Sequence, residues 1–196
     1  QNITNISKNT ENQISRIFYG TDPDAEKWYE YNEKGDLIRQ GMSVDTIVYE
    51  YAENKIIKRH LDKKHSWLSR IDYLTDQHDR IISSVRYDEN DKEISTCEYI
   101  YNPDGYLIKN IELVKTSGSR YTNEFVYNAG NLTEVKTYGK NGQLSSRYVF
   151  TYYDDITNHL NMFMQHIFDD IFPKNRLGKM NKNLVRQLSN ISKEGD

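Results

Sequence analysis

Two histidines and an aspartate near the C-terminus have a spacing that a metal site could use. His159 and His166 lie seven residues apart, hence on one face of a helix, and Asp170 follows His166 by four residues. A metal site needs a third and a fourth ligand, and the chain contains no His-Glu-x-x-His motif. A solvent-facing or capping role is the simpler interpretation, so we predict no metal site and no cofactor.

An acidic stretch in the middle of the chain begins like a calcium-binding loop. Residues 88–93 read DENDKE and place side-chain oxygens at the first and third positions. Glu93 occupies the sixth position, where such a loop needs glycine, and Tyr99 occupies the twelfth, where it needs glutamate. A charged hairpin turn explains this stretch better than a calcium site.

Sequence motifs for catalysis are missing. The chain has no Gly-x-Ser-x-Gly elbow, no phosphate-binding Gly-x-x-x-x-Gly-Lys-Ser/Thr loop and no Gly-x-Gly-x-x-Gly. Two carboxylates can still meet across adjacent strands without a linear signature, as they do in glycosidases. We therefore predict no catalytic residue, and keep open the alternative of a glycan or lipid hydrolase that uses cross-strand carboxylates.

Aromatic residues remain as candidates for binding a ligand. Tyr31, Tyr51, Tyr101 and Tyr127 occupy equivalent places before a turn, and tyrosine rings stack on sugar rings and on apolar molecules. The competing interpretation is core filling, because the chain is poor in aliphatic residues and contains 16 tyrosines. These four tyrosines are the ligand-binding residues that we predict, for a ligand that is a glycan, a hydrophobic molecule or a protein.

The elements that position these tyrosines follow from a short repeated pattern. An aromatic residue, any residue and a tyrosine precede a polar turn, and an aliphatic residue opens the next run. Aromatic residues at every second position share one strand face, and Asn, Asp and Gly supply the backbone angles of a reversal. The pattern predicts strand pairs at 27–31 with 37–42, 46–51 with 56–61, 67–74 with 80–87, 93–101 with 106–114 and 121–127 with 131–138, and a closing strand at 144–153.

The predicted fold class is mainly β. Short turns between consecutive strands favour an antiparallel hairpin meander, which forms a curled sheet or an incomplete barrel with one aromatic face. Apolar residues recur at helical spacing over 156–172 and Pro173 stops that pattern, so we expect one C-terminal amphipathic helix there. We expect a flexible tether over 1–15, a single domain over 16–188 with a short helix around 184–188, and a flexible tail over 189–196.

Charge and cysteine content exclude several classes of protein. The 26 basic and 29 acidic residues are mixed along the chain and give a net charge of −3, so we expect no nucleic-acid partner. The single Cys97 excludes an internal disulfide and a cysteine zinc site, and its strand position indicates a small buried side chain. No apolar run approaches the roughly 20 residues of a membrane-spanning helix.

Several of these segments carry a family resemblance. The Tyr-x-Tyr pattern, the turn Asn-Pro-Asp-Gly, the closing run YVFTYYD at 148–154 and the segment LGKMNKNL at 177–184 are its main features. With them, the chain resembles, from about residue 17 to 188, a secreted bacterial family of unknown function described as having a porin-like fold. It is also similar to the tyrosine-aspartate (YD) repeats of bacterial surface and toxin shells, although the turn after Tyr51 lacks both Asp and Gly.

The resemblance implies export from a Gram-negative bacterium. It implies a lipoprotein in the periplasm or on the outer-membrane surface, held to the membrane only through a lipid anchor upstream of Gln1. Neither family supplies catalytic residues. We therefore favour a non-catalytic secreted or cell-envelope binding module. A hydrolase and a structural or adhesive assembly subunit that pairs through exposed edge strands are the alternatives.

Overall fold

The computed structural model describes residues 3–11, 13–19, 26–42, 45–157 and 183–192. These residues form fourteen strands: β1 (Ile3–Lys8), β2 (Ile14–Tyr19), β3 (Glu26–Tyr31), β4 (Leu37–Gly41), β5 (Asp45–Ala52), β6 (Lys55–Asp62), β7 (Trp67–Thr75), β8 (Ile81–Asp88), β9 (Glu93–Tyr101), β10 (Leu107–Val114), β11 (Ser119–Asn128), β12 (Asn131–Tyr138), β13 (Leu144–Thr157) and β14 (Asn183–Ser192).

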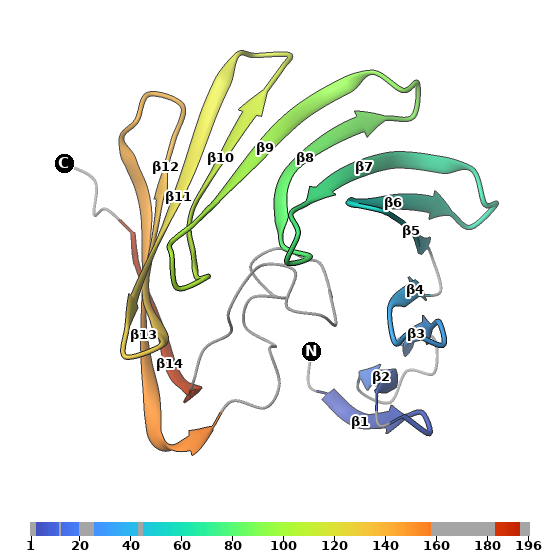
Figure 1. Ribbon diagram of the computed structural model, residues 1–196, viewed down its shortest axis with the longest axis horizontal. Helices are drawn as coiled ribbons and strands as arrows, with labels where there is room; N and C mark the ends of the chain where they lie inside the picture. The colour runs from blue at the N-terminus through green and yellow to red at the C-terminus, as the bar shows by residue number, and fades with distance from the viewer. Residues whose placement is uncertain (1–2, 12, 20–25, 43–44, 158–182, 193–196) are drawn as a thin grey trace.

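All fourteen strands belong to one antiparallel sheet in which spatial order follows sequence order. The strands succeed one another in an arc that is open on one side, with β1 and β14 at its two ends (Figure 1). The predicted antiparallel meander is therefore confirmed, and the described strands form a curled sheet that does not close into a barrel. In the described part of the chain, no helix has the length and apolar character needed to cross a bilayer.

One kind of turn connects many of the strands. Asn102 illustrates it: its backbone N–H donates to the carbonyl of Tyr106, and its side-chain Oδ1 accepts the Tyr106 N–H at 2.9 Å. Gly105 completes the turn at a φ of 87°, a backbone conformation that glycine adopts without steric cost. Asp76 builds the same turn with Arg80, and Asp88 builds it with Lys92. The DENDKE stretch is therefore a hairpin turn, as predicted.

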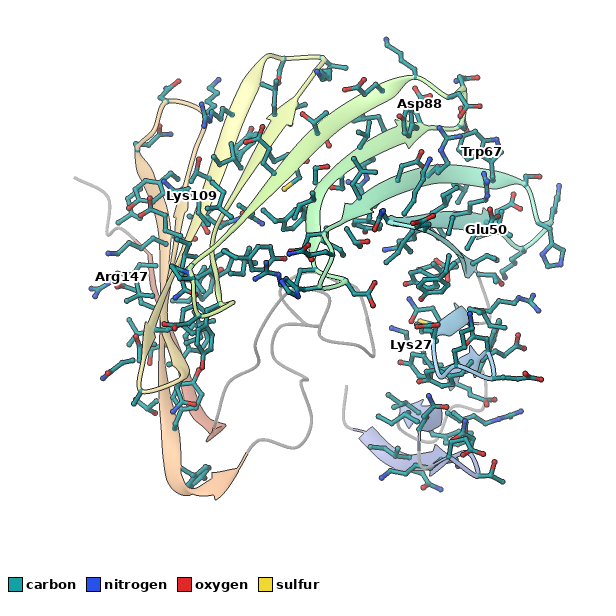
Figure 2. All side chains as sticks on the ribbon, in the orientation of Figure 1. Lys27, Glu50, Trp67, Asp88, Lys109 and Arg147 are labelled. Carbon is teal, nitrogen blue, oxygen red and sulfur yellow. The ribbon has the colours of Figure 1, made fainter. Side chains whose placement is uncertain are left out.

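The two faces of the sheet differ in chemistry. Tyr51 pairs with Ile56 and Ile56 pairs with Tyr73, so aromatic and aliphatic residues alternate from strand to strand on one face. Figure 2 shows Lys27 on the inner side of the arc and Glu50 and Arg147 on its outer side. Because Lys27 shares its face with Tyr29, the apolar face is the concave one.

The hydrophobic core lies along this concave face. It forms two clusters, one over β2–β8 and one over β10–β13, and Tyr99 packs against both. The buried hydrophobic residues are Ile17, Tyr29, Leu37, Tyr49, Ile56, Tyr73, Ile81, Leu107, Phe125, Leu132, Val135 and Phe150. Tyrosine thus supplies part of the core of this aliphatic-poor chain, as the composition predicted.

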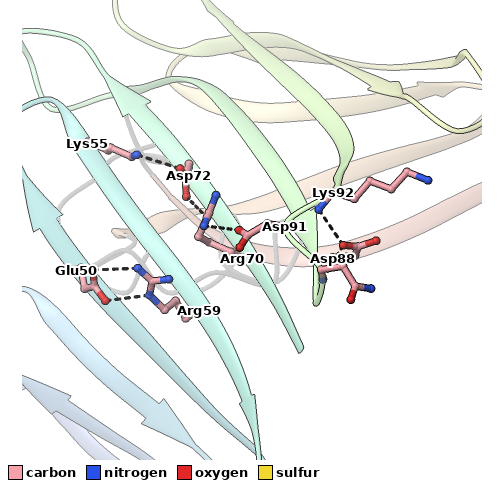
Figure 3. Close-up of polar contacts among 9 residues, drawn as sticks. Glu50, Lys55, Arg59, Arg70, Asp72, Asp88, Asp91 and Lys92 are labelled. Carbon is pink, nitrogen blue, oxygen red and sulfur yellow. Dashed lines mark hydrogen bonds and ion pairs between the residues drawn. The ribbon is translucent and has the colours of Figure 1, made fainter. Parts of the chain in front are cut away.

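Cross-strand ion pairs lie on the convex face. Lys55 Nζ lies 3.0 Å from Asp72 Oδ2, and Arg70 joins Asp72 at 2.9 Å and Asp91 at 2.7 Å (Figure 3). The Arg70 guanidinium also stacks on the Tyr87 ring at 4.2 Å. Ion pairs at the surface each contribute little stability, about 0–1 kcal/mol, so their main effect is a solvated outer face without a large excess of either charge.

The ends of the chain differ from the sequence expectation. Residues 3–8 and 14–19 form β1 and β2 where we expected a flexible tether, because backbone hydrogen bonds to a neighbour need no apolar alternation. Residues 183–192 form β14 along β13 where we expected a short helix and a flexible tail. The predicted helix over 156–172 lies outside the described residues except for Ile156 and Thr157, which end β13, and the described residues do not test the predicted domain limits.

Candidate functional site

Three of the four candidate tyrosines use their hydroxyl groups to hold the sheet together. The hydroxyl of Tyr31 donates to the carbonyl of Ile14 at 2.9 Å, that of Tyr51 to Leu37 at 2.7 Å, and that of Tyr101 to Ile81 at 2.7 Å. Tyr152 donates in the same way to Leu132. Each acceptor is the aliphatic residue that follows the turn of the preceding hairpin.

These hydrogen bonds lie where the backbone ladder stops. Pairing between β4 and β5 ends at Arg39 and Val48, so Leu37 lies beyond the last pair, at the end opposite the connecting turn. We call this end the open end of a strand pair. Tyr51 spans it with its side chain and satisfies a carbonyl of a fully buried residue. The tyrosine side chain of the repeat thus makes the hydrogen bond that a backbone N–H would make if the two strands were still paired at this point.

The β6–β7 pair has backbone hydrogen bonds at the end where the other pairs are open. Its ladder continues to Lys55 and Leu74, and the N–H of Thr75 donates to the carbonyl of Asn54 at 3.0 Å. Thr75 occupies the place that a tyrosine has in the other repeats. No open end needs bridging in this pair, so the long side chain is not required.

Tyr127 is the exception among the tyrosines. Pairing between β10 and β11 ends at Lys109 and Glu124, so the repeat predicts a hydrogen bond from Tyr127 to the carbonyl of Leu107. Instead, the Tyr127 hydroxyl is buried and has no hydrogen-bond partner in the structure. The ring of Tyr106 lies against the ring of Tyr127, with centroids 4.8 Å apart and planes tilted by 41°.

Tyr106 is a residue that the sequence analysis missed. It immediately precedes the buried aliphatic Leu107, a position that holds Asp36, Lys55, Arg80 or Asn131 in the other repeats. An aromatic residue at this position was the signal available in the sequence. Both rings are half-buried, so the Tyr106–Tyr127 pair reaches the surface at the open end of β10–β11.

The surroundings of Tyr127 favour an uncharged phenol. Burial raises the pKa of Tyr127, and it raises the pKa of Tyr101 and Tyr152 in the same way. Arg80 stacks over the Tyr101 ring at 4.8 Å, but its guanidinium is paired with Asp76 at 2.6 Å. These three phenols therefore stay neutral at physiological pH, and the cation over the Tyr101 ring already has its counter-ion.

The carboxylates with shifted pKa values do not resemble catalytic acids. Burial opposes ionisation of Asp76 and Glu134, but hydrogen bonds from Arg80 and Arg147 outweigh it and lower both pKa values. A hydrogen bond from Lys109 lowers the pKa of Glu124. A general acid at neutral pH needs a raised pKa, so these three groups serve as ion-pair partners.

The remaining chemical candidates give no site. The described residues contain no group of three or more His, Cys, Asp or Glu side chains that could hold a metal ion. His159, His166 and Asp170 lie outside the described residues. Burial raises the pKa of Cys97 to about 11, so its thiol is mostly protonated at neutral pH.

Two porin-like proteins of Bacteroides are among the solved structures that align with this chain. The one from Bacteroides uniformis aligns with a TM-score of 0.62 at 15% identity, over 91% of this chain and 78% of that one. The one from Bacteroides vulgatus aligns with a TM-score of 0.44 at 14% identity, over 72% of this chain and 89% of that one. The first match shows a shared porin-like fold, as the sequence resemblance implied.

Sequence comparisons add no family. No family model matches the chain, and no curated protein matches it. Membership in the secreted family of unknown function and the relation to YD repeats therefore stay predictions, as do export and the lipid anchor.

Proposed function

We propose that this protein is a non-catalytic binding module of a bacterial cell envelope, whose ligand contacts the open end of the β10–β11 pair. The observation that carries the proposal is the Tyr127 hydroxyl, which is buried without a partner where the other repeats make a hydrogen bond to the backbone. Such a group costs about 1–3 kcal/mol, and a ligand that pairs with it recovers that energy.

The other three candidate tyrosines fit a structural role better. The hydroxyls of Tyr31, Tyr51 and Tyr101 already donate to backbone carbonyls, so a ligand could pair with them only by breaking the sheet contacts that they make. Tyr127 differs from these three tyrosines because its hydroxyl has no hydrogen-bond partner. We therefore move the proposed ligand contact from four tyrosines to Tyr127 and its neighbour Tyr106.

The alternatives receive less support from the geometry. A hydrolase needs an acid and a base in one cleft, whereas Asp76, Glu124 and Glu134 each have a basic partner. Assembly through edge strands needs a long regular edge; the edge strand β1 has six residues and two register shifts, and the other edge strand, β14, has ten residues. Short and irregular edges are devices that oppose edge-to-edge pairing.

Thermal unfolding with added probes tests the proposal. The probes are an N-acetylglucosamine hexamer, palmitate and a Thr-Val repeat peptide, one for each predicted class of ligand. A probe present at 100 times its Kd stabilises the protein by about 2.7 kcal/mol, which raises the Tm by roughly 5–11 °C for a chain of this size. We expect one probe to raise the Tm of the wild type.

Matched variants locate the effect. Tyr106→Ala and Tyr127→Phe should lose most of the Tm increase, whereas Tyr51→Phe, which changes an equivalent tyrosine at a bonded position, should retain it. If no probe raises the Tm, or if both Tyr127→Phe and Tyr106→Ala respond like the wild type, the proposed function is wrong.

A further inference from the structure

We infer that the middle of the concave face binds a short zwitterionic peptide, in a place separate from the proposed contact at Tyr127. The inference does not depend on the function proposed above. It concerns β8, β9 and β10, which form the middle of the arc (Figure 1). Polar residues of these strands share the concave face, and we call them the polar seam: Ser84, Arg86, Ser95, Cys97, Asn110 and Glu112.

Strand register places the seam on the concave face. Ser84 pairs with the buried core residue Tyr73 and, on its other side, with Cys97. Arg86 lies two residues further along β8, and Glu112 pairs with Cys97 from β10. Because every second residue of a strand points to the same side of the sheet, these side chains lie on the side of Tyr73. The other members of the seam are in register with these residues or two residues away from them.

Two opposite charges of the seam have no partner among the described residues. Arg86 is exposed and Glu112 is half-buried, and neither forms an ion pair or a hydrogen bond with a described side chain. On the convex face, by contrast, the Arg59 guanidinium lies 3.0 Å from the Glu50 carboxylate. A free guanidinium and a free carboxylate on one face are complementary to a ligand that carries both charges.

Uncharged polar groups of the seam also lack partners in the described part of the chain. Ser84, Ser95 and Asn110 are 8%, 5% and 7% exposed. The two serine hydroxyls and Asn110 Nδ2 make no hydrogen bond there, although Asn110 Oδ1 accepts from Asn123 Nδ2 at 2.9 Å. Unlike the Tyr127 hydroxyl, none of these atoms is enclosed without a partner, so a ligand reaches them where they lie. Buried polar side chains normally have a partner, so these three favour a polar ligand on this face.

The spacing of the two charges selects a peptide of about three residues. Arg86 and Glu112 lie on strands separated by β9 and are offset along it by two residues. With strands about 4.8 Å apart and alternate residues about 6.7 Å apart, their α-carbons lie roughly 12 Å from each other. An extended chain spans about 3.3–3.6 Å per residue, so a tripeptide is about 10 Å long. Its carboxylate therefore reaches Arg86 while its ammonium group reaches Glu112.

Each end of the peptide meets a matching group. The carboxylate accepts two parallel hydrogen bonds from the Arg86 guanidinium and a third from the hydroxyl of Ser95, the register partner of Arg86. The ammonium group donates to the Glu112 carboxylate. Asn110 lies two residues from Glu112 on the same strand, and its free Nδ2 donates to a peptide carbonyl. A simple anion or a simple cation satisfies only one of the two charges, so the seam favours the zwitterion.

The test is an NMR titration of the complete ¹⁵N-labelled chain at pH 6.5, where a peptide amino group is protonated. The probes are trialanine with both ends free, N-acetyltrialanine, trialaninamide and N-acetyltrialaninamide. We expect trialanine to shift the amide resonances of residues 86, 95 and 112 and to bind most tightly. Each cap should weaken binding about fivefold, which corresponds to roughly 1 kcal/mol for an ion pair at a partly exposed site.

Four variants assign the two charges. Arg86→Gln should weaken trialanine about fivefold and leave the affinity for trialaninamide unchanged, because that probe has no carboxylate. Glu112→Gln should weaken trialanine equally and leave the affinity for N-acetyltrialanine unchanged. Glu98→Gln and Arg120→Gln are the matched controls, since both residues are exposed and lie on the opposite face of β9 and β11. Both controls should bind trialanine like the wild type, and dispersed amide resonances show that each variant is folded.

Three results overturn the inference. The first is that no peptide shifts the resonances of residues 86, 95 and 112. The second is that N-acetyltrialanine or trialaninamide binds as tightly as trialanine, which removes the role of one charge. The third is that the control variants weaken binding as much as Arg86→Gln does. None of these results concerns the Tyr127 hydroxyl, so the proposed function keeps its own test.

Discussion

Tyr101→Phe and Tyr127→Phe each remove one hydroxyl group, and the two substitutions should change the free energy of unfolding in opposite directions. The Tyr101 hydroxyl donates to the carbonyl of Ile81 at 2.7 Å, and Ile81 has no exposed surface. In Tyr101→Phe, water cannot replace the lost donor, so the free energy of unfolding should fall by about 1–3 kcal/mol. In Tyr127→Phe no hydrogen bond is lost, and removal of the unpaired hydroxyl should raise the free energy of unfolding by about 1 kcal/mol.

Urea unfolding followed by circular dichroism at pH 7 measures both changes. The two variants should move the midpoint concentration to opposite sides of the wild type with unchanged m-values, which shows that stability and not compactness has changed. Tyr51→Phe should behave like Tyr101→Phe, because its hydroxyl donates to the buried Leu37. Equal destabilisation by Tyr101→Phe and Tyr127→Phe would refute the distinction between paired and unpaired hydroxyls.

Three further predictions follow from the core, the ion pairs and the thiol. Ile81→Ala, at a position with no exposed surface, should lower the free energy of unfolding by about 2–5 kcal/mol in the same urea assay. The pKa values of Asp76, Glu124 and Glu134 are lower in the folded chain, so the unfolded chain takes up protons first and stability should be lost as the pH falls below about 5. Urea midpoints at pH 7 and pH 3.5 check this, and a higher midpoint at pH 3.5 would contradict it. Cys97, with its pKa raised to about 11, should react with a thiol-specific chromogenic disulfide at pH 8 far more slowly in the folded protein than in urea. Equal rates in the two states would contradict the burial of this thiol.

Most strands could be predicted because each repeat carries two independent signals. Tyr99 and Tyr101 alternate on one face of a strand, and the following Asn102 and Gly105 supply both a side-chain acceptor and a positive φ for the reversal. Pattern and turn chemistry agree, so the predicted strand pairs match the observed ones from β3 to β13 within a few residues.

The two end strands could not be predicted because their sequences do not combine an alternating apolar pattern with a turn motif. In β1, Ile3 and Ile6 fall on opposite faces of a regular strand, and backbone pairing with β2 decides the structure. In β14, Leu184 and Leu188 have a spacing that fits a helical turn as well as a strand. Pairing with the free edge of β13 over Ser146–Tyr152 selects the strand, and that edge exists only once the sheet has formed.

The candidate site was predictable as a set of tyrosines but not as a single tyrosine. Tyr101 and Tyr127 each precede an asparagine that opens a turn, and nothing in their local sequence separates them. The difference arises because one hydroxyl reaches a carbonyl across an open end and the other has no partner. Tyr106 was the local departure from the repeat that pointed to this place.

A pH titration of ¹³Cζ-labelled tyrosines tests the central claim most directly. The claim is that phenols gathered on the concave face are buried as neutral groups and mostly bonded to the backbone. Burial raises the pKa of Tyr31, Tyr101, Tyr127 and Tyr152, so the folded chain holds these protons more tightly than the unfolded chain. We expect all four to ionise at a higher pH in the folded chain than in the unfolded chain. Ionisation of these tyrosines near pH 10 with the sheet intact would contradict the claim.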